Sequence, residues 1–280
     1  MAKRILSTLV LWSVILGSLW LFGGPAAVAL LTILSVLTLH ELYGMADKLG
    51  GRPFRWLGLI FSIVITAGPY VLAYSSDAFD LIAGLPTGAL VLALIVCCFR
   101  ALGERDSHSR IETIASTMLG LLYVPFMLHF LVAILMRDGY EGDNLVLCLW
   151  TVAVSKFCDV GALLTGLAFG KHKMAPVISP KKTWEGAVGG VLISAGVGAA
   201  IAFFAADHLS SSLTPLVAAL IAVPLAIVTI VSDLIESAIK RRADTKDTGM
   251  LIPGIGGAFD LTDSLILTAP VAYFIFQFLE

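Results

Sequence analysis

Charged residues are scarce in this chain, and its cysteines form no pattern. Lys, Arg, Asp and Glu make up 14% of the 280 residues, whereas 58% are hydrophobic. This balance argues against one or two soluble domains and indicates a protein embedded in a membrane. The four cysteines lie within apolar runs without metal-ligand spacing, so they predict neither a disulfide framework nor a zinc site. We interpret them as small core residues: Cys97, Cys98, Cys148 and Cys158.

The sequence also lacks an internal repeat, a low-complexity tract and a Pro-rich linker, so a single integral membrane domain over residues 1–280 is the simplest division. Long apolar runs dominate it, and most reach the roughly 20 residues that cross about 30 Å of hydrocarbon. Because lipid offers the backbone no hydrogen-bond partners, and no run alternates like a barrel strand, the runs should be helices. We expect an all-α fold, a polytopic integral membrane helix bundle of about nine transmembrane helices, at 5–22, 26–42, 56–74, 81–99, 113–135, 145–168, 185–206, 214–235 and 263–279.

Lysine and arginine are almost missing from alternate loops. If the N-terminus is cytoplasmic, Arg137 is the one cation in the loops of the opposite side. This asymmetry follows the positive-inside rule and predicts a cytoplasmic N-terminus. Lys3 and Arg4 before the run 5–22, with Ala27-Val28-Ala29 after it, are also compatible with a secretory signal, but eight further runs favour a retained first helix.

One long polar passage interrupts the second half of the chain, from Ser237 to Asp263. Its mixture of cations, aspartates and a Gly/Pro-rich turn suits a polyanion held together with a metal. Mg²⁺ prefers hard oxygen ligands and commonly uses one or two carboxylates plus substrate phosphates. Asp233 and Asp260 are the candidate ligands, since one ends the eighth run and the other begins the ninth. The alternative for Asp260 is a capping box, with Asp260 at the N-cap and Asp263 at N3.

The turn around Gly256 and Gly257 permits close backbone approach but does not match a P-loop, because no Lys-Ser/Thr pair follows it. Lys181, Lys182 and Thr183 supply a second set of phosphate donors; alone, such a basic patch could equally bind anionic lipid. In the sixth run, Lys156 and Asp159 share one helical face. They form either a structural ion pair between helices or part of a site.

These residues together resemble the phosphatidate cytidylyltransferases, also called CDP-diacylglycerol synthases. The C-terminal signature of that family is matched by Ser237-x-Ile239-Lys240-Arg241, Lys246-Asp247-x-Gly249, Ile252-Pro253, Gly256-Gly257, Asp260 and Asp263. Two further motifs agree, Asp233-Leu234-Ile235-Glu236-Ser237 and Ile178-Ser179-Pro180-Lys181-Lys182-Thr183-x-Glu185-Gly186. With Asp159 and the segment Phe169–Lys173, the resemblance covers nearly the whole chain.

Four positions depart from the family pattern. The family has His where this chain has Ile255, Arg at Leu261, Tyr at Leu163 and Arg at Leu167. The missing histidine and arginines are donors that a triphosphate could use. We expect these positions to affect activity or the choice of lipid substrate rather than the fold.

The resemblance implies transfer of a cytidylyl group from CTP to phosphatidic acid, giving CDP-diacylglycerol and pyrophosphate. It implies Mg²⁺, with a second cation left open, a membrane-lipid environment and no nucleic acid partner; a homodimer is also left open. The spans within 1–135 would be mainly scaffold, and 145–280 would bear the site, facing the cytoplasm from a bacterial inner membrane. The implied residues are Asp233 and Asp260 for metal; Lys240, Arg241, Lys246, Asp247 and Asp263 for catalysis; and Ser179, Lys181, Lys182, Thr183, Ser237, Gly256, Gly257 and Asp159 for substrate.

Three other functions remain open at this stage. A CTP-dependent lipid kinase would transfer the γ-phosphoryl group to a polyprenol-like alcohol and release CDP. A transporter or ion pathway would use Lys156 and Asp159 and ignore CTP. A non-catalytic relative would bind lipid without turnover.

Overall fold

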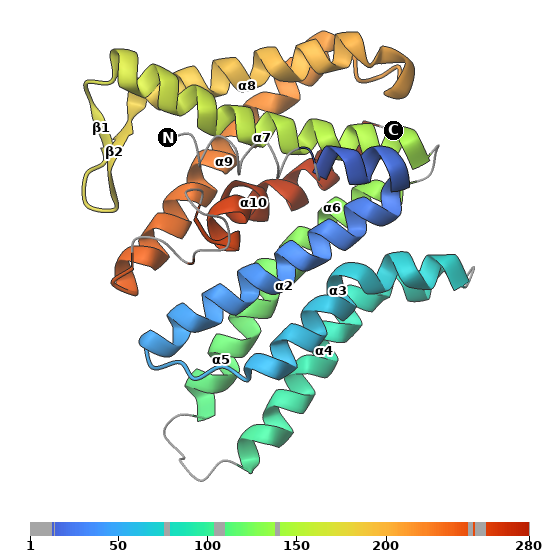
Figure 1. Cartoon of the computed structure of the whole chain (residues 1–280), viewed down its shortest axis with the longest axis vertical. Coiled ribbons are helices and arrows are strands. Elements are labelled where there is room, and N and C mark those ends of the chain that lie inside the picture. Colours follow the sequence, from blue (N-terminus) through green and yellow to red (C-terminus); the bar gives the residue numbers. More distant parts are fainter. Residues whose placement is uncertain are drawn as a thin grey trace. The chain divides into compact units, whose positions relative to one another are not determined.

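The computed structural model describes residues 13, 15–75, 79–103, 110–137, 141–245, 249 and 256–279. Within them the chain is almost entirely helical, which confirms the predicted all-α polytopic membrane protein (Figure 1). The elements are α2 (Gly24–Lys48), α3 (Arg55–Ser75), α4 (Phe79–Leu102), α5 (Arg110–Leu121), η1 (Leu122–Phe126), α6 (Met127–Leu135), α7 (Glu141–Phe169), β1 (Lys173–Ala175), β2 (Ser179–Thr183), α8 (Trp184–Phe204), η2 (Ala206–His208), α9 (Pro215–Arg242) and α10 (Ala258–Gln277).

Eight helices of the described part are long and apolar enough to cross a membrane. They correspond to the second to ninth predicted runs, whereas half of the first, 5–22, lies outside the described residues. α5, η1 and α6 together form one of these spans, Arg110–Leu135. Its π-helical turn contains Pro125, which lacks the N–H that a regular α-helical turn requires.

The chain forms two compact units, which are described separately below. Unit 1 comprises Met1–Val132 and Arg242–Thr262, and unit 2 comprises Ala133–Arg241 and Asp263–Glu280. The boundary falls within α6, at the end of α9 and within α10.

Polar groups inside unit 1 link its helices. Tyr43 of α2 is fully buried and donates its hydroxyl hydrogen to the carbonyl of Thr117 in α5, over 2.8 Å. The ring fits because glycines face it: a Cβ atom at Gly58 or Gly120 would lie 2.3 Å from Tyr43 atoms. Such small residues let helices approach closely in a lipid environment, where apolar burial gives little drive for association.

The first turn of α10 belongs to unit 1 and is capped by α2. Glu41 of α2 accepts hydrogen bonds from the N–H groups of Ala258 and Phe259, both over 2.9 Å. These groups have no partner within their own helix, and a carboxylate there also opposes the positive end of the helix dipole. Asp260 accepts a hydrogen bond from the N–H of Gly257 over 2.7 Å.

This geometry corrects the capping interpretation of the sequence. α10 begins at Ala258 rather than at 263, so Asp260 is the third residue of the helix and not its N-cap. A third-position carboxylate that reaches back to the preceding N–H is one half of a capping box. Gly256 adopts φ +120°, and a Cβ there would lie 2.4 Å from Asp260 Oδ2, so glycine is required at this turn.

Unit 2 is built on the pair α7 and α8, which run side by side in Figure 1. Glycines make this contact close: a Cβ at Gly190 would lie 2.8 Å from the carbonyl oxygen of Cys158, and one at Gly161 would lie 2.9 Å from Ile193. Two further hydrogen bonds join the helices, from Trp150 Nε1 to the carbonyl of Gly198 (2.9 Å) and from Ser194 Oγ to that of Val154 (2.7 Å). The pair is therefore a rigid support for its loop.

That loop is an antiparallel hairpin of β1 and β2, drawn at one end of α7 and α8 in Figure 1. Thr183 ends β2 and caps α8, because its Oγ1 accepts a hydrogen bond from the N–H of Gly186 over 3.1 Å. Glu185 holds the other side of the hairpin by accepting from the N–H of Lys171 (3.1 Å) and from that of His172 (3.2 Å). The lysines of β2 are thus fixed next to a helix start.

Candidate active site

The candidate site of unit 2 begins on α9, which continues to Arg242 beyond the predicted apolar run. Because residues three and four apart share a helix face, Asp233, Glu236 and Lys240 follow one another along one side. The predicted polar stripe therefore exists as far as Lys240. Asp244, at φ +49°, lies past the helix end and does not continue it.

Three carboxylates meet at this point, and we refer to them as the carboxylate trio: Asp233 and Glu236 of α9 with Asp263 of α10. One carboxylate oxygen from each of the three lies within 4.8 Å of the other two. The side chains of Glu236 and Asp263 are only 1% and 14% exposed. Like charges held this closely in a poorly solvated place need cations. A divalent metal ion fits the trio, since its donors are the hard oxygens that Mg²⁺ and Ca²⁺ prefer.

Lysines lie against every member of the carboxylate trio. Lys182 Nζ is 2.5 Å from Asp233 Oδ2, and Lys240 Nζ is 2.5 Å from Glu236 Oε1. Lys156 Nζ is 3.3 Å from Asp263 Oδ1. The site therefore combines three negative with three positive side chains, an arrangement suited to phosphate chemistry that depends on charge stabilisation.

Lys156 has further partners on α7 and α10. It donates a hydrogen bond to Ser264 Oγ over 2.6 Å and lies 3.8 Å from Asp159 Oδ2. Lys156 and Asp159 thus form an ion pair within α7, while Lys156 also links α7 to α10 through Asp263 and so reaches the carboxylate trio.

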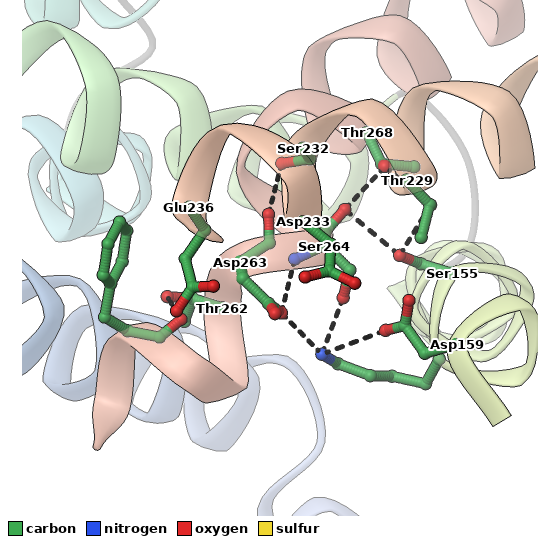
Figure 2. Close-up of polar contacts among 12 residues, drawn as sticks. Ser155, Asp159, Thr229, Ser232, Asp233, Glu236, Thr262, Asp263, Ser264 and Thr268 are labelled. Carbon is green, nitrogen blue, oxygen red and sulfur yellow. Dashed lines mark hydrogen bonds and ion pairs between the residues drawn. The ribbon is translucent and has the colours of Figure 1, made fainter. Parts of the chain in front are cut away.

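Hydroxyl groups hold the backbone around Asp263, as Figure 2 shows. Ser232 Oγ donates to the carbonyl of Asp263, and the N–H of Ser264 donates to Asp263 Oδ1 over 2.6 Å. Behind them, Thr229 lies 3.0 Å from Ser155 and 3.0 Å from Thr268, oxygen to oxygen. This chain of buried hydroxyls joins α7, α9 and α10, so the orientation of Asp263 is fixed by three helices.

A cavity of about 590 Å³ opens beside the carboxylate trio. One part of its wall is polar and includes Asp159, Asp233 and Lys182. The other part is apolar, with Leu163 and Leu167 of α7 at 62% and 78% exposure. Such a cavity can take an amphiphile whose head is anionic. The remaining lining residues are Ala162, Gly166, Gly170, Lys173, Met174, Lys181, Thr183, Gly186, Ala187 and Ile230.

The predicted site residues fall into three groups in the structure. Unit 2 brings together Asp159, Lys181, Lys182, Thr183, Asp233, Lys240 and Asp263 around the cavity and the carboxylate trio. Ser179 starts β2, Ser237 lies on α9, and Arg241 Nε donates to the carbonyl of Ile178 over 3.4 Å. Gly256, Gly257 and Asp260 belong to the α10 turn of unit 1, and Lys246 and Asp247 lie outside the described residues.

The four departures from the family pattern likewise lie in different parts of the chain. Leu163 and Leu167 line the cavity, whereas Leu261 lies in the first turns of α10 in unit 1. Ile255 lies outside the described residues.

Three residues were not assigned to the site from the sequence: Glu236, Ser264 and, in unit 1, Glu41. Lys156 was left open as either a member of a structural ion pair or part of a site. Lys156 was visible as a charge inside the apolar run 145–168, and Glu236 as a charge directly after the run 214–235. Charges at such positions are a usual sign of function in membrane proteins. Glu41 gives the same sign at the end of the run 26–42. Ser264 gives no sequence signal beyond its position after Asp263.

Comparison with known proteins agrees with these motifs. A model of the cytidylyltransferase family matches residues 2–279. A phosphatidate cytidylyltransferase of Synechocystis sp. is 29% identical, over 92% of this chain and 90% of its own length. The phosphatidate cytidylyltransferase of Thermotoga maritima is 31% identical over 80% of this chain and 88% of its own length. That of Rickettsia felis is 38% identical over 59% of this chain and 71% of its own length.

Proposed function

We propose that this chain, which belongs to the cytidylyltransferase family, transfers a cytidylyl group from CTP to phosphatidate and releases pyrophosphate. The observation that carries the proposal is the position of the carboxylate trio and its lysines beside an amphiphilic cavity, all within unit 2. A triphosphate requires cations and metal-binding carboxylates together, whereas simple adhesion to anionic lipid requires no carboxylates.

The reaction is a substitution at the α-phosphorus of CTP. A phosphate oxygen of phosphatidate forms a bond to that phosphorus, and the bond from the α-phosphorus to the oxygen bridging to the β-phosphate breaks, with pyrophosphate as the leaving group. The attacking oxygen already carries negative charge, so the chain has no covalent intermediate to form. Its task is to position two polyanions and to neutralise them.

Asp233 and Asp263 are the proposed ligands of a divalent cation, with Glu236 completing the carboxylate trio. A bound Mg²⁺ would supply charge stabilisation at the phosphate oxygens. We also propose that Asp260 contributes to metal binding, because it belongs to the same C-terminal family signature as Asp263. Ser232 and Ser264 would keep Asp263 in its ligating orientation through their hydrogen bonds to it.

The lysines of the β2 segment are the proposed phosphate donors. Lys181 and Lys182 line the cavity, and Lys173 joins them from β1. Lys240 and Arg241 would add positive charge from the end of α9, together with Lys246, and Asp247 would serve as an orienting carboxylate. Each ammonium can donate to several phosphate oxygens at once, which suits a substrate whose oxygens outnumber the donors.

The apolar wall of the cavity suits the lipid substrate. Leu163, Leu167 and Met174 would contact the glycerol end of phosphatidate, while its acyl chains stay in the bilayer. We propose that the site faces the cytoplasm, where CTP is found, because the loop between α7 and α8 and the end of α9 are rich in lysine and arginine. The spans of residues 1–135 would serve mainly as scaffold.

The proposal is tested with purified protein, phosphatidate, Mg²⁺ and CTP labelled in separate reactions at the α- or the γ-phosphate. We expect the α label in the extracted lipid and the γ label in pyrophosphate. A lipid kinase would instead place the γ label in a lipid alcohol and release CDP. Absence of label from the lipid in both reactions, over a range of lipid phosphates and metals, would contradict the proposal and favour a binding or transport function.

A further inference from the structure

We propose that Lys156, Lys182 and Lys240 are exchangeable counter-ions of the carboxylate trio. They hold Asp263, Asp233 and Glu236 when no metal ion is bound, and they turn toward substrate phosphates when a divalent cation takes the carboxylates. Metal binding and phosphate binding would then strengthen each other. This inference rests on the proposed function, because it assumes that the trio is the metal site.

The contact of each trio carboxylate with a lysine is the first observation behind this inference. Lys182 and Lys240 each lie 2.5 Å from one oxygen of Asp233 and Glu236, respectively. Lys156 lies 3.3 Å from Asp263 Oδ1. All six side chains belong to unit 2. Each carboxylate of the trio thus has a cation of its own in contact.

Coulombic repulsion supplies the reason for exchange. An ammonium group 2.5 Å from a carboxylate oxygen occupies the position that a metal ion bound to that oxygen would need. A divalent cation at the trio would therefore stand within a few ångströms of three ammonium groups, where like charges repel strongly. The lysines lower this energy by moving to other anions.

The cavity gives Lys182 a place to move to. Lys182 lines it directly, next to Lys181 and Lys173, and its side chain remains 23% exposed. A phosphate in the cavity could accept a hydrogen bond from Lys182 once the ion pair between Lys182 and Asp233 is broken. Conversely, a phosphate that captures Lys182 leaves Asp233 open to the metal. By linkage, either ligand must raise the affinity for the other by the same factor.

The test measures binding of Mn²⁺, a spectroscopic substitute for Mg²⁺, to the purified protein by electron paramagnetic resonance, with and without pyrophosphate. The variant is Lys182→Met, which keeps the apolar stem and removes the charge. Its matched control is Lys181→Met, because Lys181 lines the same cavity and no ion pair of Lys181 occurs among the described residues. Asp233→Asn defines which part of the Mn²⁺ signal comes from the trio.

We expect Lys182→Met to bind Mn²⁺ about fivefold or more tightly than the unmodified protein in the absence of pyrophosphate, within the usual range of coupling between sites. Pyrophosphate should raise Mn²⁺ affinity strongly in the unmodified protein and less in Lys182→Met. Lys181→Met should keep the original affinity without pyrophosphate. Lys182→Gln serves as a second variant if the Met variant does not fold, and Lys156→Met should act in the same direction.

Unchanged or weaker Mn²⁺ binding in both Lys182 variants would overturn the exchange, even if cytidylyl transfer is intact. An equal gain in Lys181→Met would also overturn it, because the effect would then be general electrostatics. If the unmodified protein shows no Mn²⁺ signal that depends on Asp233, with or without pyrophosphate, the metal assignment fails together with the exchange. The label-transfer reaction distinguishes these cases, since it reports the proposed function independently.

Discussion

Lys156 donates a hydrogen bond to Ser264 Oγ over 2.6 Å while its ammonium group lies 3.3 Å from Asp263 Oδ1. Lys156 of α7 thus contacts Asp263 and Ser264, the first two residues of α10 that belong to unit 2. Its side chain is 28% exposed and that of Asp263 is 14% exposed, so water screens this contact only partly. The charge of Lys156 therefore matters both for stability and for the carboxylate trio.

Replacing Lys156 by Met should lower cytidylyl transfer about 10- to 100-fold, because the substrate phosphates lose a hydrogen bond from a charged group, which contributes about 1.5–3 kcal/mol. It should also destabilise the protein by about 1–3 kcal/mol, because Asp263 and Ser264 lose a charged partner. Transfer rates and thermal melting in detergent measure the two effects. Lys48→Met, at the exposed end of α2, should change neither. A Lys156→Met protein with full transfer would remove Lys156 from the site.

Asp260→Asn separates the two roles of that carboxylate. The amide oxygen of Asn can still accept from the N–H of Gly257, so the start of α10 should be kept and the melting temperature should stay within about 2 °C. Transfer should be abolished, because the negative charge is gone. Retained transfer would show that Asp260 serves the helix start alone, and a large loss of stability would show that its charge is needed for folding.

Gly190→Ala tests the close contact of α7 and α8. The added Cβ would lie 2.8 Å from the backbone oxygen of Cys158, which cannot rotate away, so we expect a loss of about 1–3 kcal/mol and a lower melting temperature. Gly196→Ala on the same helix is the control, since nothing lies within 4 Å of its Cβ position. Equal melting temperatures for both variants would argue against this packing.

The sequence predicted the spans well because hydrocarbon thickness alone sets their length. The two polar clusters at β2 and at the end of α9 were also predictable, since charge is rare in this chain and therefore conspicuous. The pairing of Lys182 with Asp233 was not, although both residues were singled out. It depends on the twist of a hairpin and on how far α9 continues as a helix, which apolar periodicity does not report.

The residue that caps the start of α10 could not be predicted from local sequence spacing either. Local spacing suggested that Asp260 and Asp263 cap it, but Glu41, which precedes it by more than 200 residues, supplies the acceptor. Only the tertiary structure brings α2 to that position. The same holds for Lys156, whose partner could not be chosen from among several aspartates by spacing alone.

The central claim is that the carboxylate trio performs cytidylyl transfer. The most direct measurement compares initial rates of α-label transfer from CTP to phosphatidate for the unmodified protein, Asp233→Asn, Asp263→Asn and the control Asp143→Asn, whose carboxylate lies 3.3 Å from His208 outside the trio. We predict that the two trio variants, folded by thermal melting, lose more than about 100-fold in rate, beyond the usual loss for outer-shell residues, whereas Asp143→Asn keeps the original rate. Full transfer by either trio variant would contradict the account.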